Sequence, residues 1–199
     1  KRLKKKKTRK RNMQNLFIIS GPSGAGEDSI IDGLAKLLPV ERTVTTTTRA
    51  PRAGESDGQS YYFISAEQFQ QKITSGEIVE YAQHYNGNFY GVTNTELERV
   101  AASGKIGIWK IDYKGVETAK KMFPGIVAIL ITAPLAIMEQ RIRMRDHLTE
   151  AYIAERMTYT REWLKHTYIY DYIVENAQNK LEEAIGEVST IIKKCSPLA

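Results

Sequence analysis

The chain has 199 residues, of which 42% are hydrophobic, and a formal net charge of +6. This length is sufficient for one domain with a substantial core, or for one core with inserted lobes. No run of 18 apolar residues occurs, so we expect no membrane-spanning helix. The single cysteine, Cys195, excludes an internal disulfide and favours a reducing cytoplasm.

The positive charge is concentrated at one end of the chain. Residues 1–11 hold nine lysines and arginines and no acidic residue, so the remainder carries a net charge of −3. Such a segment is an arm that contacts nucleic acid or another anionic surface, a solvated and disordered extension, or sequence outside the native start. We predict a disordered basic tail over residues 1–12 and leave these alternatives open, weak nucleic-acid contact among them.

The body begins with a strand, a glycine-rich turn and a helix. Residues 16–19 are apolar, and after the turn the helical spacing of apolar residues stops at Pro39. Backbone amides in such a turn, here those of residues 23–28, cradle phosphate oxygens at a helix N-terminus. This order therefore predicts a phosphate loop.

Beyond this loop, short strands and helices follow one another along the chain. Strands are predicted at residues 40–48, 61–64, 78–83, 88–90, 105–111, 126–132 and 172–175. Helices are predicted at residues 65–76, 93–104, 114–122, 134–145, 149–166 and 181–194. The continuous apolar run at 126–132 is typical of a strand that is buried on both faces.

Strands that alternate with helices of about ten or more residues indicate a parallel α/β core. We predict an α/β fold, in which a phosphate-loop parallel sheet core is flanked by helices and carries an inserted mixed α/β lobe and a helical lid. The proposed division assigns the core to residues 13–46, 94–137 and 167–199, the lobe to 47–93 and the lid to 138–166.

Seven short motifs occur in one order along the body. They are GPSGAG, TTTRxPRxGE, YxF from Tyr61, IVEYAQ, NFYG, GKxxIxxID and YDYIVxN. In these motifs the chain resembles guanylate kinase, the nucleoside-monophosphate kinase that makes GDP from GMP and ATP. The resemblance covers residues 16–193, nearly the whole body, and it implies that the lobe binds GMP.

Two arginines on a proline-stiffened loop are candidates for binding the acceptor phosphate. Arg49 and Arg52 lie three residues apart, and arginine side chains bind phosphate in a bidentate manner and stay charged. The resemblance implies that both hold the phosphate of GMP, with hydrogen bonds from the hydroxyls of Tyr61 and Tyr90. The alternative is that the two arginines are solvated loop residues.

Glu80 is the candidate for recognising the base. It lies in an apolar strand, where a carboxylate is costly unless it is paired. Guanine offers N1–H and the N2 amino group as adjacent donors, and adenine does not. We expect Thr45 and Asp112 to assist. The family usually has a hydroxyl residue where Val92 stands, so Thr93 either replaces it at GMP or is only a helix cap.

Further arginines resemble the lid arginines of the family, which close over the phosphates. They are Arg141, Arg145 and Arg156. Phosphoryl transfer needs stabilisation of charge more than covalent chemistry, which suits arginines on a lid. The alternative for them is ion pairing on a helix face. Asn176 matches the residue that recognises the adenine of ATP, or else is a turn asparagine.

The phosphate loop departs from its motif. The spacing fits G-x-x-x-x-G-K-[ST] at Gly21, Gly26 and Ser29 if one extra residue is allowed, and Glu27 occupies the lysine position. A carboxylate about 4 Å from a phosphate charge costs about 4 kcal/mol at an effective dielectric constant near 20. The predicted ATP phosphate-binding residues are Gly21, Ser23, Gly24, Ala25, Gly26, Glu27, Asp28 and Ser29.

A second departure offers a compensation. The family strand before Gly115 usually has two acids, where this chain has Lys110 and Asp112. We hypothesise a charge swap in which Lys110 pairs with Glu27 and supplies an ammonium near the β- and γ-phosphates. The alternative is two independent changes in an inactive chain. We expect Mg²⁺ to arrive with ATP, held partly by the Ser29 hydroxyl, and no tightly bound cofactor.

The sequence therefore predicts a cytoplasmic ATP:GMP phosphotransferase, monomeric or homodimeric, whose partners are GMP and ATP. The alternative is a catalytically inactive guanylate kinase-like module that binds GMP or a phosphorylated partner.

Overall fold

A computed structural model describes residues 15–83, 87–144 and 149–196. The predicted basic tail over residues 1–12 lies outside these residues. Among the described residues, no helix is both long enough and apolar enough to cross a membrane.

A parallel sheet forms the centre of the fold. Its strand order is β2-β7-β1-β8-β9, and every pair of neighbours is parallel. The strands are β1 (Leu16–Ser20), β2 (Val40–Arg42), β7 (Ile106–Lys110), β8 (Val127–Thr132) and β9 (Tyr172–Glu175). All residues of the central strand β1 are buried, which explains its uninterrupted apolar sequence. The α/β fold with a parallel core is confirmed.

Helices cover both faces of this sheet. On one face lie α1 (Glu27–Leu37) and α7 (Leu181–Cys195), which pack on Phe17 and Ile19. On the other lie α3 (Asn94–Ala102) and α4 (Tyr113–Met122), which pack on Leu16 and Ile18. The alternation along β1 thus divides the core into two apolar clusters.

A second sheet extends from the core. Its order is β4-β3-β6-β5, with β3 (Thr45–Thr47), β4 (Tyr61–Phe63), β5 (Ile78–Gln83) and β6 (Phe89–Thr93). The helix α2 (Ala66–Thr74) starts at the expected Ser65 capping box, and its Phe69 stacks on Phe89 at 5.4 Å between ring centroids. This sheet is the mixed lobe that the sequence predicts.

The prediction of one strand over residues 40–48 is wrong, because this segment crosses from one sheet to the other. Arg42 still pairs with Ile108 in the core sheet, whereas Thr45 pairs with Tyr61 in the second sheet. The break falls at residues 43–44. A run of β-branched residues predicts extended backbone but does not reveal which sheet each residue joins.

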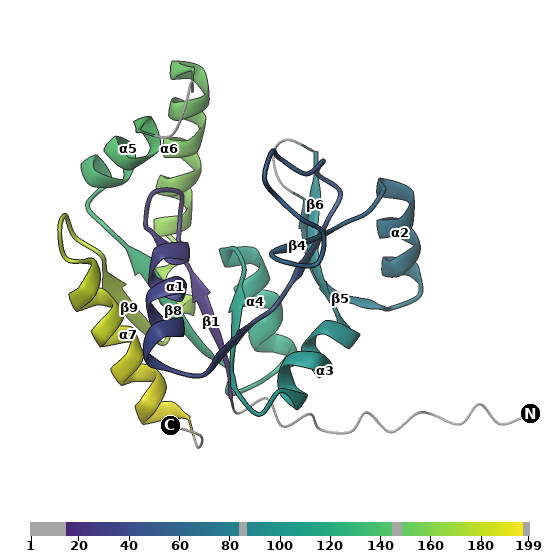
Figure 1. Cartoon of the computed structure of the whole chain (residues 1–199). Coiled ribbons are helices and arrows are strands. Elements are labelled where there is room, and N and C mark those ends of the chain that lie inside the picture. Colours follow the sequence, from purple (N-terminus) through teal and green to yellow (C-terminus); the bar gives the residue numbers. More distant parts are fainter. Residues whose placement is uncertain (1–14, 84–86, 145–148, 197–199) are drawn as a thin grey trace, which may run out of the picture.

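A helical pair rises beside the second sheet. It consists of α5 (Leu135–Arg143) and α6 (Glu150–Leu164), held together by Ile142, Ile153 and Met157. A 3₁₀ turn, η1 (Thr167–Ile169), leads on to β9. Figure 1 shows that the helical pair and the second sheet rise at the same end of the core sheet.

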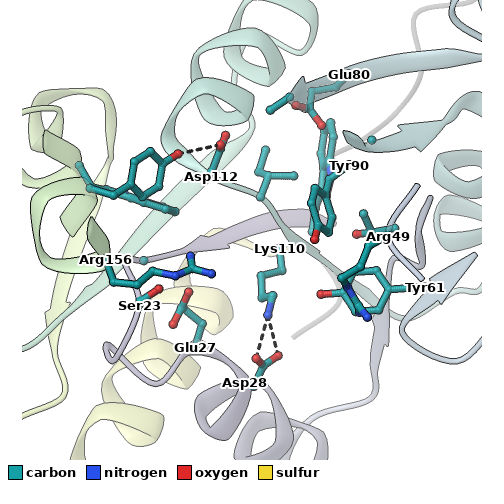
Figure 2. Close-up of a pocket in the computed structure, with 18 of the residues that line it drawn as sticks. Ser23, Glu27, Asp28, Arg49, Tyr61, Glu80, Tyr90, Lys110, Asp112 and Arg156 are labelled. Carbon is teal, nitrogen blue, oxygen red and sulfur yellow. Dashed lines mark hydrogen bonds and ion pairs between the residues drawn. The ribbon is translucent and has the colours of Figure 1, made fainter. Parts of the chain in front are cut away.

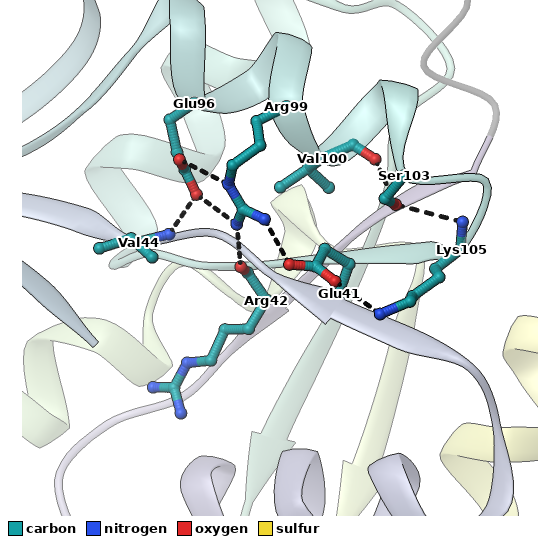
Figure 3. A network of polar contacts seen from close by, with 8 residues as sticks. All are labelled: Glu41, Arg42, Val44, Glu96, Arg99, Val100, Ser103 and Lys105. Atoms are coloured by element: carbon teal, nitrogen blue, oxygen red, sulfur yellow. Dashed lines mark hydrogen bonds and ion pairs between the residues drawn. The ribbon is translucent and has the colours of Figure 1, made fainter. Parts of the chain in front are cut away.

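An ion-pair network holds the crossing between the sheets (Figure 3). The Glu96 carboxylate, only 4% exposed, accepts a hydrogen bond of 2.6 Å from the backbone N–H of Val44. Arg99 donates to Glu96 from Nε at 3.0 Å and from Nη2 at 2.8 Å, and it also pairs with Glu41. The buried charge of Glu96 is thus paired, and α3 fixes the backbone at the crossing.

We expect the substitution Arg99→Met to lower the free energy of unfolding by about 2–3 kcal/mol, because it leaves the Glu96 carboxylate buried without its cation. Urea unfolding measures the effect. The control is Lys105→Met, which removes a surface pair with Glu41 and should cost less than about 1 kcal/mol. Equal losses in both variants would contradict a special role for the buried pair.

Candidate active site

A cavity of about 300 Å³ lies at the carboxyl ends of β1 and β7, between the second sheet and α6. Figure 2 shows its arrangement. The phosphate loop lies at one end and Glu80 at the other, with Lys110 between them. Arg49 and Tyr61 face the cavity from the second sheet, and Arg156 faces it from α6. Ligand sites in open α/β sheets occupy this edge.

The phosphate loop has the backbone that its glycines predict. Gly24 and Gly26 both have positive φ, at 87° and 93°. A Cβ on Gly24 would lie 2.5 Å from the Met138 carbonyl oxygen, so a larger residue does not fit. Gly26 is the N-cap of α1, and no side chain caps the helix there. The N-cap residue therefore does not compete with an anion for the first amides of α1.

The structure divides the predicted phosphate-binding residues into two groups. Those that line the cavity are Gly21, Ser23, Gly24, Glu27 and Asp28. Ala25 is buried beneath the loop, and Ser29 is exposed on α1 without lining the cavity. Asp28 directly follows the lysine position and lines the cavity, so it occupies the hydroxyl position of the motif. Ser29, which the sequence placed there by allowing one extra residue after the lysine position, lies outside the cavity lining.

Asn176 and Arg141 support the loop from behind. The Asn176 side chain is 3% exposed and donates from Nδ2 to the Ala25 carbonyl oxygen at 2.8 Å. Arg141 donates to the carbonyl oxygens of Gly24 at 3.2 Å and of Asn176 at 3.0 Å. Neither side chain lines the cavity. The sequence predicts Arg141 over the phosphates and Asn176 at the adenine. In this structure both side chains instead bind backbone carbonyl groups of the loop and position it.

Arg156, which the sequence predicts to be a lid arginine, contributes to the cavity from α6. It lines the cavity, donates from Nη2 to the Tyr152 hydroxyl at 2.6 Å, and stacks over the Tyr152 ring at 4.9 Å. Figure 2 shows it pointing toward the same part of the cavity as Glu27 and Ser23. The predicted Arg145 lies outside the described residues.

Lys110 lies at the phosphate loop, as the charge-swap hypothesis requires, but its ion pair runs to Asp28 rather than to the expected Glu27. The Nζ atom contacts both Asp28 carboxylate oxygens, at 2.9 and 2.8 Å. Arg42 donates to the same carboxylate at 2.6 Å. Burial by itself would raise the pKa of Asp28, but the charges of Lys110 and Arg42 outweigh it and lower this pKa.

The predicted acceptor-phosphate residues lie together. Arg49, Arg52, Tyr61 and Tyr90 all line the cavity. The guanidinium of Arg49 is 5.1 Å from the centre of the Tyr61 ring, which stands edge-on to Tyr90.

The sequence reasoning assigned no role to the acid that completes this group. Arg49 donates from Nη1 and Nη2 to the two carboxylate oxygens of Glu55, at 2.8 and 2.9 Å. This fork, with the backbone N–H of Arg52, lowers the pKa of Glu55 to about 2. Glu55 thus holds the bidentate position on Arg49 that an anionic ligand would take. Its place three residues after Arg52 in the loop was the available signal.

A buried carboxyl group forms the other end of the cavity. Glu80 is 4% exposed, and a Cβ on Gly115 would lie 2.7 Å from its Oε1, so a larger residue at position 115 would displace the carboxyl group. Burial, followed by the nearby charge of Asp112, raises the pKa of Glu80 to about 8. Glu80 is thus largely protonated at neutral pH in the empty cavity.

Asp112, Thr45 and Tyr159 also line the cavity, and Asp112 lies close enough to Glu80 to raise its pKa. Asp112 caps α4 by accepting from Gly115 N–H at 2.9 Å, and it accepts from the Tyr159 hydroxyl at 3.2 Å. Sequence reasoning missed Tyr159, although it follows Arg156 by three residues on one helix face.

Thr93 does not join this group. Its hydroxyl accepts from the backbone N–H of Glu96 at 3.2 Å and caps α3, and it does not line the cavity. Val92 is 1% exposed in the apolar core. The role of Thr93 at GMP is therefore corrected to that of a helix cap.

Comparison with known proteins gives the family. Residues 13–195 match the family model described as guanylate kinase. The chain belongs to the guanylate kinase family. A guanylate kinase of Idiomarina loihiensis is 39% identical over 166 residues, which are 81% of this chain and 79% of that protein. One of Escherichia coli O157:H7 is 35% identical over 182 residues, 89% of this chain and 86% of that protein.

A solved structure agrees with this assignment. The crystal structure of guanylate kinase from Anaplasma phagocytophilum has a TM-score of 0.71 and 28% sequence identity, and the match covers 90% of this chain and 84% of that one. The predicted family and fold of the chain are thus confirmed over nearly its whole body.

Because the folded state raises the Glu80 pKa from 4.5 to about 8, the protonated group stabilises the fold, and this stability is lost as the pH rises from about 4.5 to about 8. The variant Glu80→Gln cannot ionise. We expect the free energy of unfolding of this variant to exceed that of the wild type by about 4–5 kcal/mol at pH 8.5, and to be similar to it at pH 4.5. Urea unfolding at both pH values measures this.

The matched control is Glu77→Gln, which changes an exposed carboxylate that is paired with Lys72. A Glu80→Gln difference that is the same at both pH values would show that the carboxyl group does not titrate as described.

Proposed function

We propose that the chain is an ATP:GMP phosphotransferase, which transfers the γ-phosphoryl group of ATP to GMP and gives ADP and GDP. The observation that carries the proposal is that one cavity joins a phosphate loop, a group of arginines and tyrosines, and a buried carboxyl group. These are the parts needed to hold a donor triphosphate, an acceptor phosphate and a base. Membership of the guanylate kinase family supports the same substrates.

The base is recognised by Glu80. As a carboxylate it accepts from N1–H and the N2 amino group of guanine, a pair of donors that adenine lacks. Binding guanine therefore offsets the desolvation that keeps this group protonated in the empty cavity. Asp112 assists from beside Glu80, and Thr45, which also lines the cavity, is a second helper.

The acceptor phosphate is held by Arg49 and Arg52, with Tyr61 and Tyr90. Because Glu55 occupies the guanidinium fork of Arg49, the phosphate exchanges with this carboxylate, or shares the guanidinium with it. An exchange of one bidentate anion for another keeps the Arg49 charge paired throughout.

The transfer is a direct in-line displacement. An oxygen of the GMP phosphate forms a bond to the γ-phosphorus while the bond from that phosphorus to the β–γ bridging oxygen breaks, and ADP leaves. Amides of the phosphate loop and the guanidinium of Arg156 stabilise the charge on the transferring group. The lid and the lobe, assigned to residues 138–166 and 47–93, exclude water so that ATP is not hydrolysed.

Magnesium would accompany ATP. The donors at the loop are the carboxylates of Glu27 and Asp28, which line the cavity. They suit Mg²⁺, which binds one or two carboxylates together with substrate phosphates. The ion would neutralise charge on the phosphates when bound. We place this activity in the cytoplasm, and the alternative is an inactive module that binds GMP.

An assay that couples ADP formation to NADH oxidation tests the proposal. We expect ADP to form from ATP only when GMP is present, and AMP to be a poor acceptor. The variant Arg49→Lys should raise the KM for GMP about tenfold or more, because it removes the bidentate contact. Binding of GMP by calorimetry without any ADP formation would contradict the enzyme and favour the inactive module.

The affinity for GMP should also depend on pH through Glu80. As the carboxylate is the binding form and its pKa is about 8, the Kd for GMP should fall several-fold, up to about tenfold, from pH 7 to pH 8.5. This range lies above the phosphate pKa near 6. Titration calorimetry in two buffers would also detect the released proton. Glu80→Gln should bind more weakly and without this pH dependence, whereas a pH dependence unchanged in this variant would exclude Glu80 as its source.

A further inference from the structure

The phosphate loop carries acids where its motif carries a cation and a hydroxyl. In the motif G-x-x-x-x-G-K-[ST], Glu27 stands at the lysine position and Asp28 at the hydroxyl position. A triphosphate bound there meets two carboxylates instead of an ammonium. The lost cation has to be replaced if the chain transfers phosphoryl groups.

The sheet register brings one lysine to this place. Lys110 is the last residue of β7, and it pairs with Ile19 of β1, one residue before the strand ends and the loop begins. Its side chain lines the cavity, and its Nζ lies 2.8 Å from Asp28 Oδ2. Figure 2 shows Lys110 in the middle of the cavity, between the loop and the tyrosines of the acceptor site.

Asp28 has a second cation that does not line the cavity. Arg42, at the end of β2, donates to Asp28 Oδ1 at 2.6 Å. If Lys110 turns toward a phosphate, Asp28 keeps the charge of Arg42 and is not left unpaired. Lysine suits such a move, because its ammonium has three donors on a flexible stem.

We propose that Lys110 supplies, from β7, the cation that binds the β- and γ-phosphates of ATP, in place of the lysine that the phosphate loop lacks. The proposal rests on the proposed phosphotransferase function and adds a catalytic residue to it. Asp28 holds the ammonium at the loop before ATP binds, and Arg42 neutralises Asp28 afterwards.

The competing explanation is an ion pair that only fastens α1 to β7. Lys110 and Arg42 share the same carboxylate, so a structural pair predicts similar effects for the loss of either cation. A catalytic Lys110 predicts unequal effects, because only Lys110 lines the cavity.

The test compares Lys110→Met with Arg42→Met as the matched control. We expect Lys110→Met to lower kcat about a hundredfold or more, the range for the loss of one group that stabilises the transferring charge. It should also raise the Kd for a non-hydrolysable ATP analogue about tenfold and leave the Kd for GMP unchanged. Arg42→Met should have clearly smaller effects, about tenfold at most on kcat and about threefold on either Kd, because it removes one partner of Asp28 while its own charge does not reach the phosphates.

A second variant adds a rescue. Placing the lysine of the motif back in the loop, as Glu27→Lys, should recover activity at least about tenfold in the Lys110→Met background and much less in the wild type, because the two cations serve one purpose. Circular dichroism and thermal unfolding confirm that each variant folds.

Equal losses in the two Met variants would overturn the proposal, as would a Glu27→Lys gain that is the same in both backgrounds. If the wild type forms no ADP, the proposed phosphotransferase function fails. The Kd for the ATP analogue still decides the role of Lys110, because a Lys110→Met value equal to that of Arg42→Met would then reject it.

Discussion

The parallel pairing of β1 with β7 is the constraint on which the site depends. Ile19 lies beside Lys110, so the phosphate loop that follows β1 and the residues that follow β7 emerge together at one edge. This places Lys110 at Asp28, and it places Asp112, two residues later, at the start of α4 near Glu80. Two neighbouring strands therefore position the phosphate loop at one end of the cavity and Asp112 at the other.

Two equally buried carboxyl groups have different roles, because one has partners that stabilise the fold and the other lines the cavity. Glu96 and Glu80 are each 4% exposed. Glu96 is paired with Arg99 and accepts from Val44 N–H, and these contacts hold the crossing between the sheets. The carboxyl group of Glu80 forms no hydrogen bond or ion pair within the described ranges, and its pKa rises to about 8. A buried carboxyl group without a partner lowers the free energy of unfolding. When it lines a cavity, it can accept hydrogen bonds from a pair of donors on a ligand.

Much of the fold follows from local signals. The apolar run of β1, the glycines of the loop and the Ser65 capping box predict their elements, because each signal acts within a few residues. The single strand expected over 40–48 was wrong, because the sheet that each half joins depends on residues distant in sequence, such as Ile108 and Tyr61.

The site shows the same division. Motif spacing identified Arg49, Tyr61, Tyr90 and Glu80, which do share one cavity. Motif spacing did not show that Asn176 and Arg141 bind the backbone of the loop from behind. Nor did it show that the Thr93 hydroxyl caps α3. These roles depend on which backbone groups lie near each side chain in the folded chain. The reciprocal charges did suggest Lys110 at the loop, and only the folded structure shows Asp28 as its partner.

The most direct test of this account is a crystal structure with a dinucleotide in which a phosphate chain joins adenosine to guanosine. The account predicts Lys110 Nζ within about 3 Å of a phosphate oxygen, with Arg42 still on Asp28 and the Glu80 carboxylate on the guanine N1 and N2 donors. A structure in which Lys110 stays on Asp28, out of reach of every phosphate oxygen, would contradict it.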